Sequence, residues 1–185
     1  MENKILGLHH ITAIAGDAKR NFDFYSKILG LRFIKKTVNF DDPGTYHFYF
    51  GDEAGSAGTI LTFFPWGEGI QQGRKGSGMV TEIGYSVPKG SLDFWQKRFE
   101  QYNVIYNKPA EKFGEKYLTF LDPDGLKLEL IESKTGDNRK GWETDEVKAD
   151  VATKGFHNIT LTLNDIKPTA AILTEIFGYK LIDQD

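Results

Sequence analysis

Hydrophobic and polar residues alternate over positions 8–15, which predicts a strand with two different faces. One face carries Leu8, His10, Thr12 and Ile14, and the other carries His9, Ile11, Ala13 and Ala15. Apolar residues then recur at helical spacing, at Phe22, Tyr25, Ile28 and Leu29. Asp17 has the type and position of a helix N-cap, and Gly30 has those of a C-terminal stop. The pattern therefore predicts a strand followed by an amphipathic helix.

The same pattern returns 148 residues later in the chain. Eight of the 27 positions in 8–34 are identical in 156–182 without a gap, with Asp165 as the cap and Gly178 as the stop. Half way between the two copies, residues 82–87 have the pattern of another strand, followed by a helix with Ser91 as its cap. The sequence therefore indicates an internal repeat with a period of 74 residues, half of 148.

Each of the first two repeats closes with a hairpin. The predicted strands are 46–50 with 59–64, and 116–121 with 126–131, the second pair joined by the turn residues Asp122-Pro123-Asp124-Gly125. The unit is β-α-β-β-β, and we expect an α+β fold of curved mixed sheets. We assign 1–70 to a first module, 78–135 to a second, 136–154 to a linker and 155–185 to the start of a third, incomplete module. The helices should pack against the sheets through Phe22, Tyr25 and Leu29, and through Leu92, Trp95 and Phe99.

Charge and composition narrow the range of partners. The 185 residues carry 23 basic and 26 acidic side chains, a formal net charge of −3, without a long block of either sign. This leaves no basic surface for a nucleic acid or an anionic membrane, so the expected partner is a small molecule. The absence of Cys excludes disulfides and thiolate nucleophiles. The N-terminal residues turn polar at His9 and His10 before a signal-peptide core can form, and we expect a cytoplasmic protein.

Four motifs carry a family resemblance. They are Gly7 to Thr12 (GLHHIT), Lys35 to His47 (KKTVNFDDPGTYH), Gly58 to Trp66 (GTILTFFPW) and Phe120 to Gly125 (FLDPDG). They resemble the vicinal oxygen chelate superfamily of glyoxalases, bleomycin-resistance proteins and extradiol dioxygenases, and within it the hydroquinone-type ring-cleaving dioxygenases. The resemblance implies the glyoxalase/dioxygenase fold with four modules per polypeptide, the first paired with the fourth and the second with the third. The sequence ends soon after the third module begins.

The resemblance also implies a metal site. In such relatives the metal is held by the second His of the His-His pair, by a His that opens the fourth module and by a Glu on the last strand of that module. His10 is then the metal ligand of this chain, and the other ligands are expected outside it. Two His and one carboxylate leave open positions on Fe(II) for substrate and O₂. Thr12 shares the face of His10 and is a candidate to touch them, and the resemblance makes His9 a hydrogen-bond donor beside the metal.

The second module offers an alternative group of ligands. Glu129 lies where the wider superfamily places a carboxylate ligand, and Glu82 takes the position of the first-module His. With Asn158 nearby, the two carboxylates are able to bind a hard cation, although alternating charge on a solvated sheet face explains the same residues. His157 aligns with His9 rather than His10, so we do not expect it to bind metal. His47, with aromatic neighbours, fits substrate contact and packing equally.

Three functions remain open. The leading hypothesis is an Fe(II)-dependent dioxygenase, or an N-terminal portion of one, that opens a hydroquinone or catechol ring with O₂, with Phe48, Phe50 and Phe64 lining the ring pocket. A glyoxalase-like isomerase or transferase using Mn, Ni or Zn would instead need Glu129 as its base. A metal-free small-molecule binding or resistance protein is the third. Because an incomplete set of modules leaves a concave face open, we expect a homodimer, and we expect this chain alone to be inactive.

Overall fold

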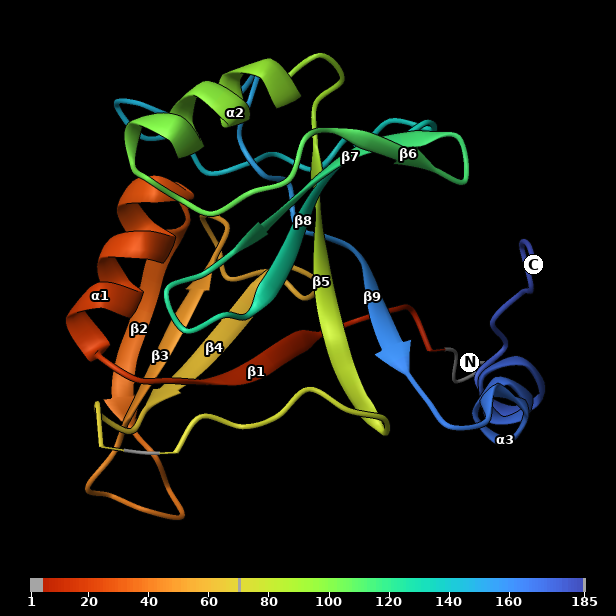
Figure 1. Cartoon of the computed structure of the whole chain (residues 1–185), viewed down its shortest axis with the longest axis horizontal. Helices are drawn as coiled ribbons and strands as arrows, with labels where there is room; N and C mark the ends of the chain where they lie inside the picture. Colours follow the sequence, from red (N-terminus) through yellow and green to blue (C-terminus); the bar gives the residue numbers. More distant parts are fainter. Residues whose placement is uncertain (1–4, 70, 185) are drawn as a thin grey trace.

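The computed structural model describes residues 5–69 and 71–184, which form two mixed sheets with helices against them (Figure 1). The first sheet has the strand order β1-β4-β3-β2, with β1 parallel to β4 and the other pairs antiparallel. Its elements in chain order are β1 (His10–Ala15), α1 (Ala18–Asp23), the π-helical η1 (Phe24–Ile28), β2 (Arg32–Val38), β3 (Tyr46–Gly51) and β4 (Ile60–Pro65). The predicted β-α-β-β-β unit is confirmed.

The second sheet repeats this plan and recruits one further strand. Its order is β6-β7-β8-β5-β9, with β5 parallel to β8. Its elements are β5 (Met79–Val87), α2 (Leu92–Gln101), β6 (Ala110–Lys112), β7 (Glu115–Leu121), β8 (Lys127–Glu132) and β9 (Phe156–Thr162). β9 opens the third copy of the repeat and pairs antiparallel with β5, so the second and third modules share a sheet as the resemblance implied.

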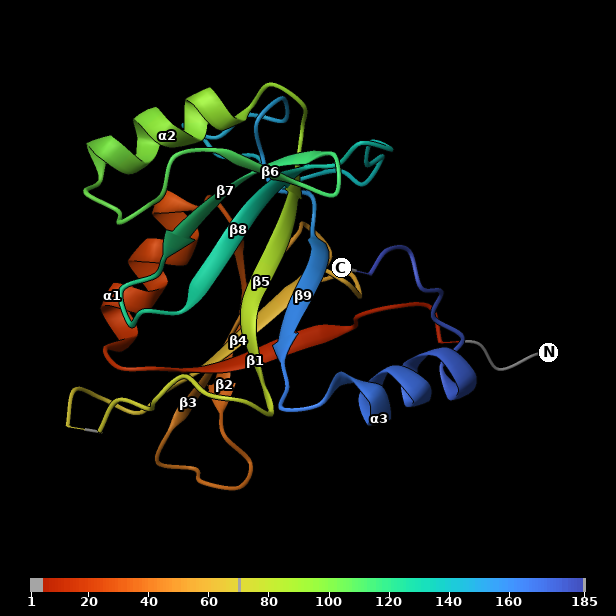
Figure 2. The same ribbon diagram turned by 45° about the vertical axis from the view of Figure 1, so that its right-hand side comes forward.

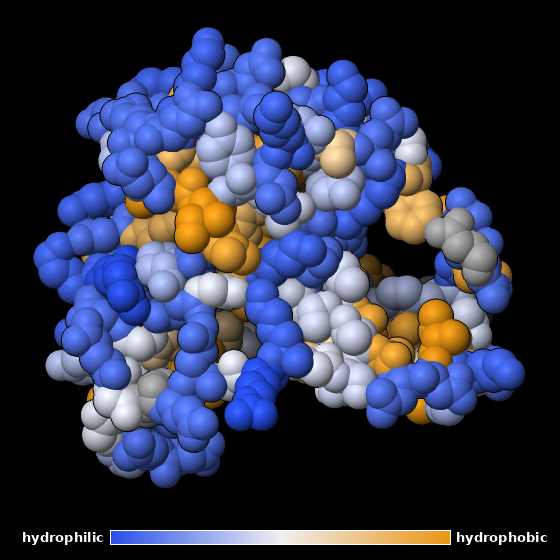
Figure 3. All heavy atoms as spheres, viewed as in Figure 1, coloured by the Kyte–Doolittle hydropathy of each residue, from blue (hydrophilic) through white to orange (hydrophobic). Residues whose placement is uncertain are grey.

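The third copy continues into a helix that no sheet covers. α3 (Ile166–Ala171) and the π-helical η2 (Ile172–Ile176) extend away from both sheets in two views of the chain (Figure 2). Neither segment contains a buried residue. Apolar side chains accordingly gather on the surface at this end of the molecule (Figure 3), and they include Ile166, Ile172, Ile176, Phe177, Leu181 and Ile182.

Aromatic side chains fill the space between α1, η1 and the first sheet. The ring of Tyr25 lies 4.5 Å from that of Phe63 and 5.4 Å from that of Phe50, and Phe22 packs edge-on against Phe33. In the second module Trp95 and Phe99 are fully buried beneath α2. The predicted helix stripes therefore form the core, because a helix that buries one apolar face against a sheet removes the most hydrophobic area from water.

Polar contacts lock the two modules together. The buried guanidinium of Arg98 on α2 donates to the backbone oxygens of Lys27 and Ile28, where η1 ends. The turn after β7 also contacts η1: Asp122 accepts from the hydroxyl of Tyr25 at 2.9 Å. The predicted turn is present, with a backbone bond from Gly125 N to Asp122 O, but it also joins the modules, a role that its local sequence does not reveal.

Two local expectations need correction. Ser91 occupies the N-cap position of α2, but its hydroxyl does not cap the helix and donates backward to Pro88 O. The carboxylate of Glu132 accepts from the backbone of Gly90 and Leu92 instead. The helices of the first and third copies end in a π-helical turn, which apolar spacing does not predict.

Residues 136–154 contain no helix or strand, but Val147 and Ala152 are buried in the core. The described residues contain no helix with the length and hydrophobicity to cross a membrane. The module boundaries given above remain our proposed division.

Candidate functional site

The candidate site lies on the face of the first sheet that points away from α1. Alternation turns Ile11, Ala13 and Ala15 toward the core and leaves His10 and Thr12 exposed. The strand register continues this face across the sheet in two neighbouring rows. One row is Thr12, Thr62, Tyr49 and Lys35, and the next is Ile14, Phe64, His47 and Thr37.

His10 and His9 contact each other directly. Their Nδ1 atoms are 3.1 Å apart and their rings meet edge to face with centroids 5.2 Å apart. A hydrogen bond between two Nδ1 atoms leaves Nε2 of His10 as its free ring nitrogen. β1 begins only at His10, so the alternation that was expected to turn His9 to the opposite face does not extend to it.

Thr12 lies beside Thr62 on the neighbouring strand. The Thr62 hydroxyl donates to Thr12 Oγ1 at 2.8 Å, and Thr62 is fully buried. Because Thr12 accepts this bond, its own hydroxyl proton remains available to another oxygen. The pair thus orients one exposed donor on the face that carries His10.

The same face carries His47, whose sequence context fits substrate contact and packing equally. The His47 ring stacks on Phe64 with centroids 4.1 Å apart, and its Nδ1 lies 3.0 Å from the Tyr49 hydroxyl. Burial, with smaller contributions from the charges of His10 and Lys35, lowers the pKa of His47, so the imidazole is neutral at pH 7.

Only one of the three Phe residues expected to line a ring pocket lies on this face. Phe48 and Phe50 are buried on the helix side of the sheet, so assigning them to a ring pocket was wrong. Phe64 lies on the site side. The period of two in β3, His47 and Tyr49 against Phe48 and Phe50, is the signal that separates these two sets.

The second sheet has carboxylates on the corresponding face, and lysines neutralise them. Glu129 is 1% exposed and accepts from Lys112 Nζ at 2.6 Å, and Glu82 pairs with Lys127. Burial alone would raise the pKa of Glu82, but the hydrogen bond and charge of Lys127 outweigh it and lower that pKa. Both carboxylates already have cationic partners. The face is charged and ion-paired, but it is not the solvated face of the alternative, because Glu129 is buried. The ion pair with Lys112 leaves Glu129 poorly suited to act as a base beside His10.

Asn158 and His157 also lie on this face and contact each other. Asn158 lies opposite Gly84 in the β5–β9 pair, and its Nδ2 is 3.1 Å from His157 Nδ1. The other nitrogen of His157 is 3.2 Å from a carboxylate oxygen of Glu115. Within residues 5–69 and 71–184 no three His, Asp or Glu side chains gather to hold a metal ion. The described residues therefore do not make a complete metal site, and His10 is a single ligand candidate.

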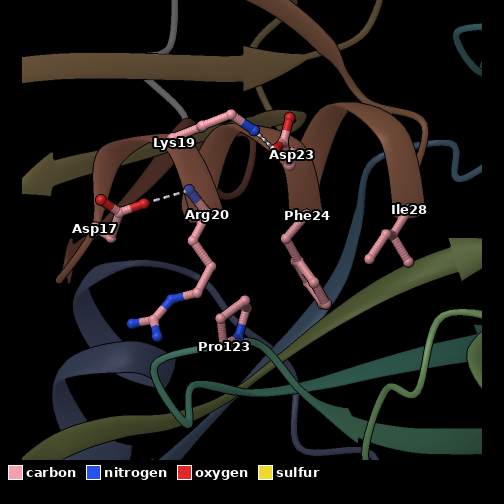
Figure 4. A pocket seen from close by; sticks show the side chains of 7 residues that line it. All are labelled: Asp17, Lys19, Arg20, Asp23, Phe24, Ile28 and Pro123. Carbon is pink, nitrogen blue, oxygen red and sulfur yellow. Dashed lines mark hydrogen bonds and ion pairs between the residues drawn. The ribbon is translucent and has the colours of Figure 1, made fainter.

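A pocket of about 330 Å³ lies elsewhere, between α1 and the turn after β7 (Figure 4). Its charged groups already have partners: Lys19 pairs with Asp23, and Asp17 accepts from the backbone of Arg20. Phe24, Ile28 and Pro123 supply its apolar wall. α1 lies on the opposite side of the first sheet from His10, so this pocket is separate from the candidate site.

Comparison with known proteins agrees with this fold. The chain is 50% identical over 185 residues to MhqO of Bacillus subtilis (strain 168), provisionally named a ring-cleaving dioxygenase, and covers 58% of that protein. It is 39% identical over 166 residues to chlorohydroquinone/hydroquinone 1,2-dioxygenase of Sphingobium indicum, covering 89% of this chain and 52% of the relative.

A solved structure supports the same assignment. The crystal structure of a provisionally named dioxygenase from Bacillus subtilis subsp. subtilis str. 168 matches with a TM-score of 0.91 and 49% identity, over 98% of this chain and 58% of that one. The chain therefore spans less than two thirds of the length of these relatives. Residues 7–130 match the sequence profile of one family. The chain belongs to the Glyoxalase/Bleomycin resistance protein/Dioxygenase superfamily.

Proposed function

We propose that this chain supplies the N-terminal portion of a non-haem Fe(II) dioxygenase of extradiol type. This enzyme would open hydroquinone or catechol rings. The observation that carries the proposal is His10, exposed on a sheet face beside the available hydroxyl of Thr12. Relatives that bear the names of ring-cleaving and hydroquinone dioxygenases, at 50% and 39% identity respectively, support it. The remaining ligands come from outside this chain in this proposal, because the described residues offer only His10.

Three residues have distinct roles in the proposal. His10 would coordinate the metal through Nε2. His9 fixes the tautomer and the ring orientation of His10 through the contact between their Nδ1 atoms. Thr12 donates its free hydroxyl proton to an oxygen of the bound substrate. Iron, when bound, would polarise the phenol oxygen and O₂ and hold them at neighbouring positions.

Iron binding tests the role of His10. Anaerobic titration of the chain with Fe(II) should give weak binding that His10→Ala abolishes, because water competes well against so few protein ligands. His157→Ala is the matched control and should bind iron as the wild type does. Equal loss of iron in both variants would contradict the assignment of His10.

Oxygen uptake tests the reaction. With a hydroquinone the 185-residue chain alone should consume little or no O₂. A fusion that adds the remaining C-terminal part of MhqO should consume O₂, and His10→Ala in the fusion should reduce the rate at least about 100-fold, a loss of about 2.7 kcal/mol in transition-state stabilisation. Strong uptake by the isolated chain would show that its own residues complete the site. Hydroquinone binding that is unaffected by Fe(II), without uptake by the fusion, would favour a metal-free binding protein.

We also propose that the chain self-associates. The edge of β1 opposite β4 has no partner strand among the described residues, and the apolar stripe of α3 and η2 is uncovered. Open strand edges and contiguous apolar patches are usually covered, and two-fold dimers are the simplest way for one chain to cover both. Sedimentation velocity should show a dimer, and a stable monomer at all concentrations would contradict it.

A further inference from the structure

His47 is fixed on two sides, yet one of its ring nitrogens has no partner. Stacking on Phe64 at 4.1 Å sets the plane of the ring, and the bond to Tyr49 at 3.0 Å sets its rotation. Nε2 is shielded from solvent and has no hydrogen-bond partner among the described residues. A shielded polar atom without a partner costs about 1–3 kcal/mol, so its retention in a well-fixed ring calls for an explanation.

The bond to Tyr49 makes the free nitrogen adaptable. When the Tyr49 hydroxyl donates to Nδ1, Nε2 carries the proton and is a donor; when Nδ1 donates to Tyr49, Nε2 is an acceptor. A neutral imidazole of this kind suits a hydroxyl group, which both donates and accepts. A carboxylate or phosphate would instead select a permanent cation such as Arg.

The position of His47 connects it to the candidate site. Its row on the sheet adjoins the row of Thr12 and Thr62, on the face that carries His10. Apolar Phe64 lies next to His47 and offers a surface for an aromatic ring. The face therefore combines a metal-ligand candidate, an aromatic wall and an unused hydrogen-bonding nitrogen.

We propose that His47 is a specificity-determining residue that binds a second hydroxyl group of the aromatic substrate through Nε2, after the side chains that shield this nitrogen in the structure move aside, with Tyr49 as its positioning residue. This inference rests on the proposed function, because it assumes that an aromatic diol binds on the His10 face. In this proposal, His47 and Tyr49 of β3 distinguish an aromatic ring with two hydroxyl groups from a ring with one. Loss of the hydrogen bond should weaken diol binding and leave binding of the monohydroxy ring unchanged.

The test compares two probes that differ at one ring substituent. Hydroquinone and 4-methylphenol are titrated anaerobically into the metal-free chain, and dissociation constants are taken from NMR shifts. The wild type should prefer hydroquinone about tenfold, equivalent to about 1.4 kcal/mol. His47→Phe keeps a ring on Phe64 and should reduce the preference to about one by weakening hydroquinone alone. Tyr49→Phe should reduce it partly, because the imidazole remains but loses its orienting bond.

Further readouts separate this role from a structural one. The ¹⁵N signal of His47 Nε2 should move with hydroquinone and stay unchanged with 4-methylphenol. His157→Phe is the matched control and should keep the wild-type preference. A His47→Phe variant that retains the preference, or a wild type that binds neither probe or binds both equally, would overturn the inference. The proposed reaction fails separately, if the fusion with the C-terminal part of MhqO consumes no O₂ while His47→Phe still removes the preference.

Discussion

The starts of the first and third modules have the same local structure but opposite burial. α1 and η1 span Ala18–Asp23 and Phe24–Ile28, and α3 and η2 span Ile166–Ala171 and Ile172–Ile176, so every boundary is displaced by the same 148 residues. Leu29 in the first copy is 1% exposed, whereas its counterpart Phe177 is 41% exposed. Identical winding therefore coexists with very different packing.

The π-helical turn is a local property of the repeat. Leu29 N donates to Phe24 O and Leu31 N to Tyr25 O, and the third copy repeats both bonds from Phe177 to Ile172 and from Tyr179 to Leu173. Gly30 and Gly178 follow with φ of 68° and 73°, a left-handed conformation that glycine adopts at little cost. Since the uncovered helix has the same turn, contact with a sheet is not what creates it.

Tertiary contacts account for the difference in burial. The first copy has its own hairpin strands β3 and β4 to pack on, Arg98 at the end of η1, and Asp122 bonded to Tyr25. The third copy has β9 on the second sheet, and α3 lies away from it (Figure 2). The sequence of the repeat therefore determines where each helix begins and ends, and the neighbouring strands determine how far the helix is buried and stabilised.

The largest expected effect separates the two copies by truncating equivalent side chains. Leu29→Ala should lower the free energy of unfolding by about 2–5 kcal/mol, because it leaves a cavity in the core. Phe177→Ala should change it by less than about 0.5 kcal/mol, because the side chain is partly in water. Urea denaturation followed by circular dichroism measures both.

An equal loss of unfolding free energy in both variants would contradict the difference in burial between the two copies. It would mean that the stripe of α3 is covered in solution, and the loss in Phe177→Ala should then increase with protein concentration if a second copy covers it.

The second effect removes the contact at the end of η1. Arg98→Met keeps an unbranched apolar side chain but loses bonds of 2.7 Å to two backbone oxygens and of 2.9 Å to Glu146. We expect a loss of about 2–3 kcal/mol, since bonds from a charged donor are involved. Amide exchange at Leu29 and Leu31 should rise toward the rates of Phe177 and Tyr179, which lack such a clamp.

Arg20→Met is the control for this change. Its ion pair with Asp124 is at the surface and should contribute less than about 1 kcal/mol. If Arg98→Met lowers stability without faster exchange at Leu29, the guanidinium stabilises the contact with Glu146 and does not stabilise the helix end.

The sequence predicts what depends on neighbours along the chain. Alternation in 10–15, the caps Asp17 and Asp165, and the stops Gly30 and Gly178 follow from backbone geometry and are confirmed, whereas the strand does not include residues 8 and 9. Contacts between strands do not follow from these local patterns. The ion pair of Glu129 with Lys112 joins residues 17 positions apart through three strands, and no local pattern specifies it.

In the candidate site too, some features follow from the local sequence pattern and others depend on contacts between strands. The exposure of His10 and Thr12 follows from alternation, whereas the bond from Thr62 to Thr12 spans 50 residues and requires the parallel pairing of β1 with β4. The unpaired nitrogen of His47 depends on what packs around it, which a single sequence does not state.

The smallest effect concerns the hydroxyl that distinguishes Tyr25 from its counterpart Leu173. Burial raises the pKa of Asp122, although bonds from Leu126 N and the Tyr25 hydroxyl to the carboxylate oppose the rise. A carboxyl whose folded pKa is raised favours the folded state most at low pH, and this contribution is lost as the pH rises through that pKa.

Tyr25→Phe removes one stabilising bond of the ionised Asp122 carboxylate, so it should lower the free energy of unfolding by about 1–2 kcal/mol at pH 7 and by clearly less at pH 3. Urea midpoints of the variant and the wild type at both pH values give this difference, and Tyr179→Phe, in the third copy and 45% exposed, should show none at either pH. An equal loss for Tyr25→Phe at pH 7 and pH 3 would mean that the hydroxyl contributes by packing, and the two copies would then differ in burial alone.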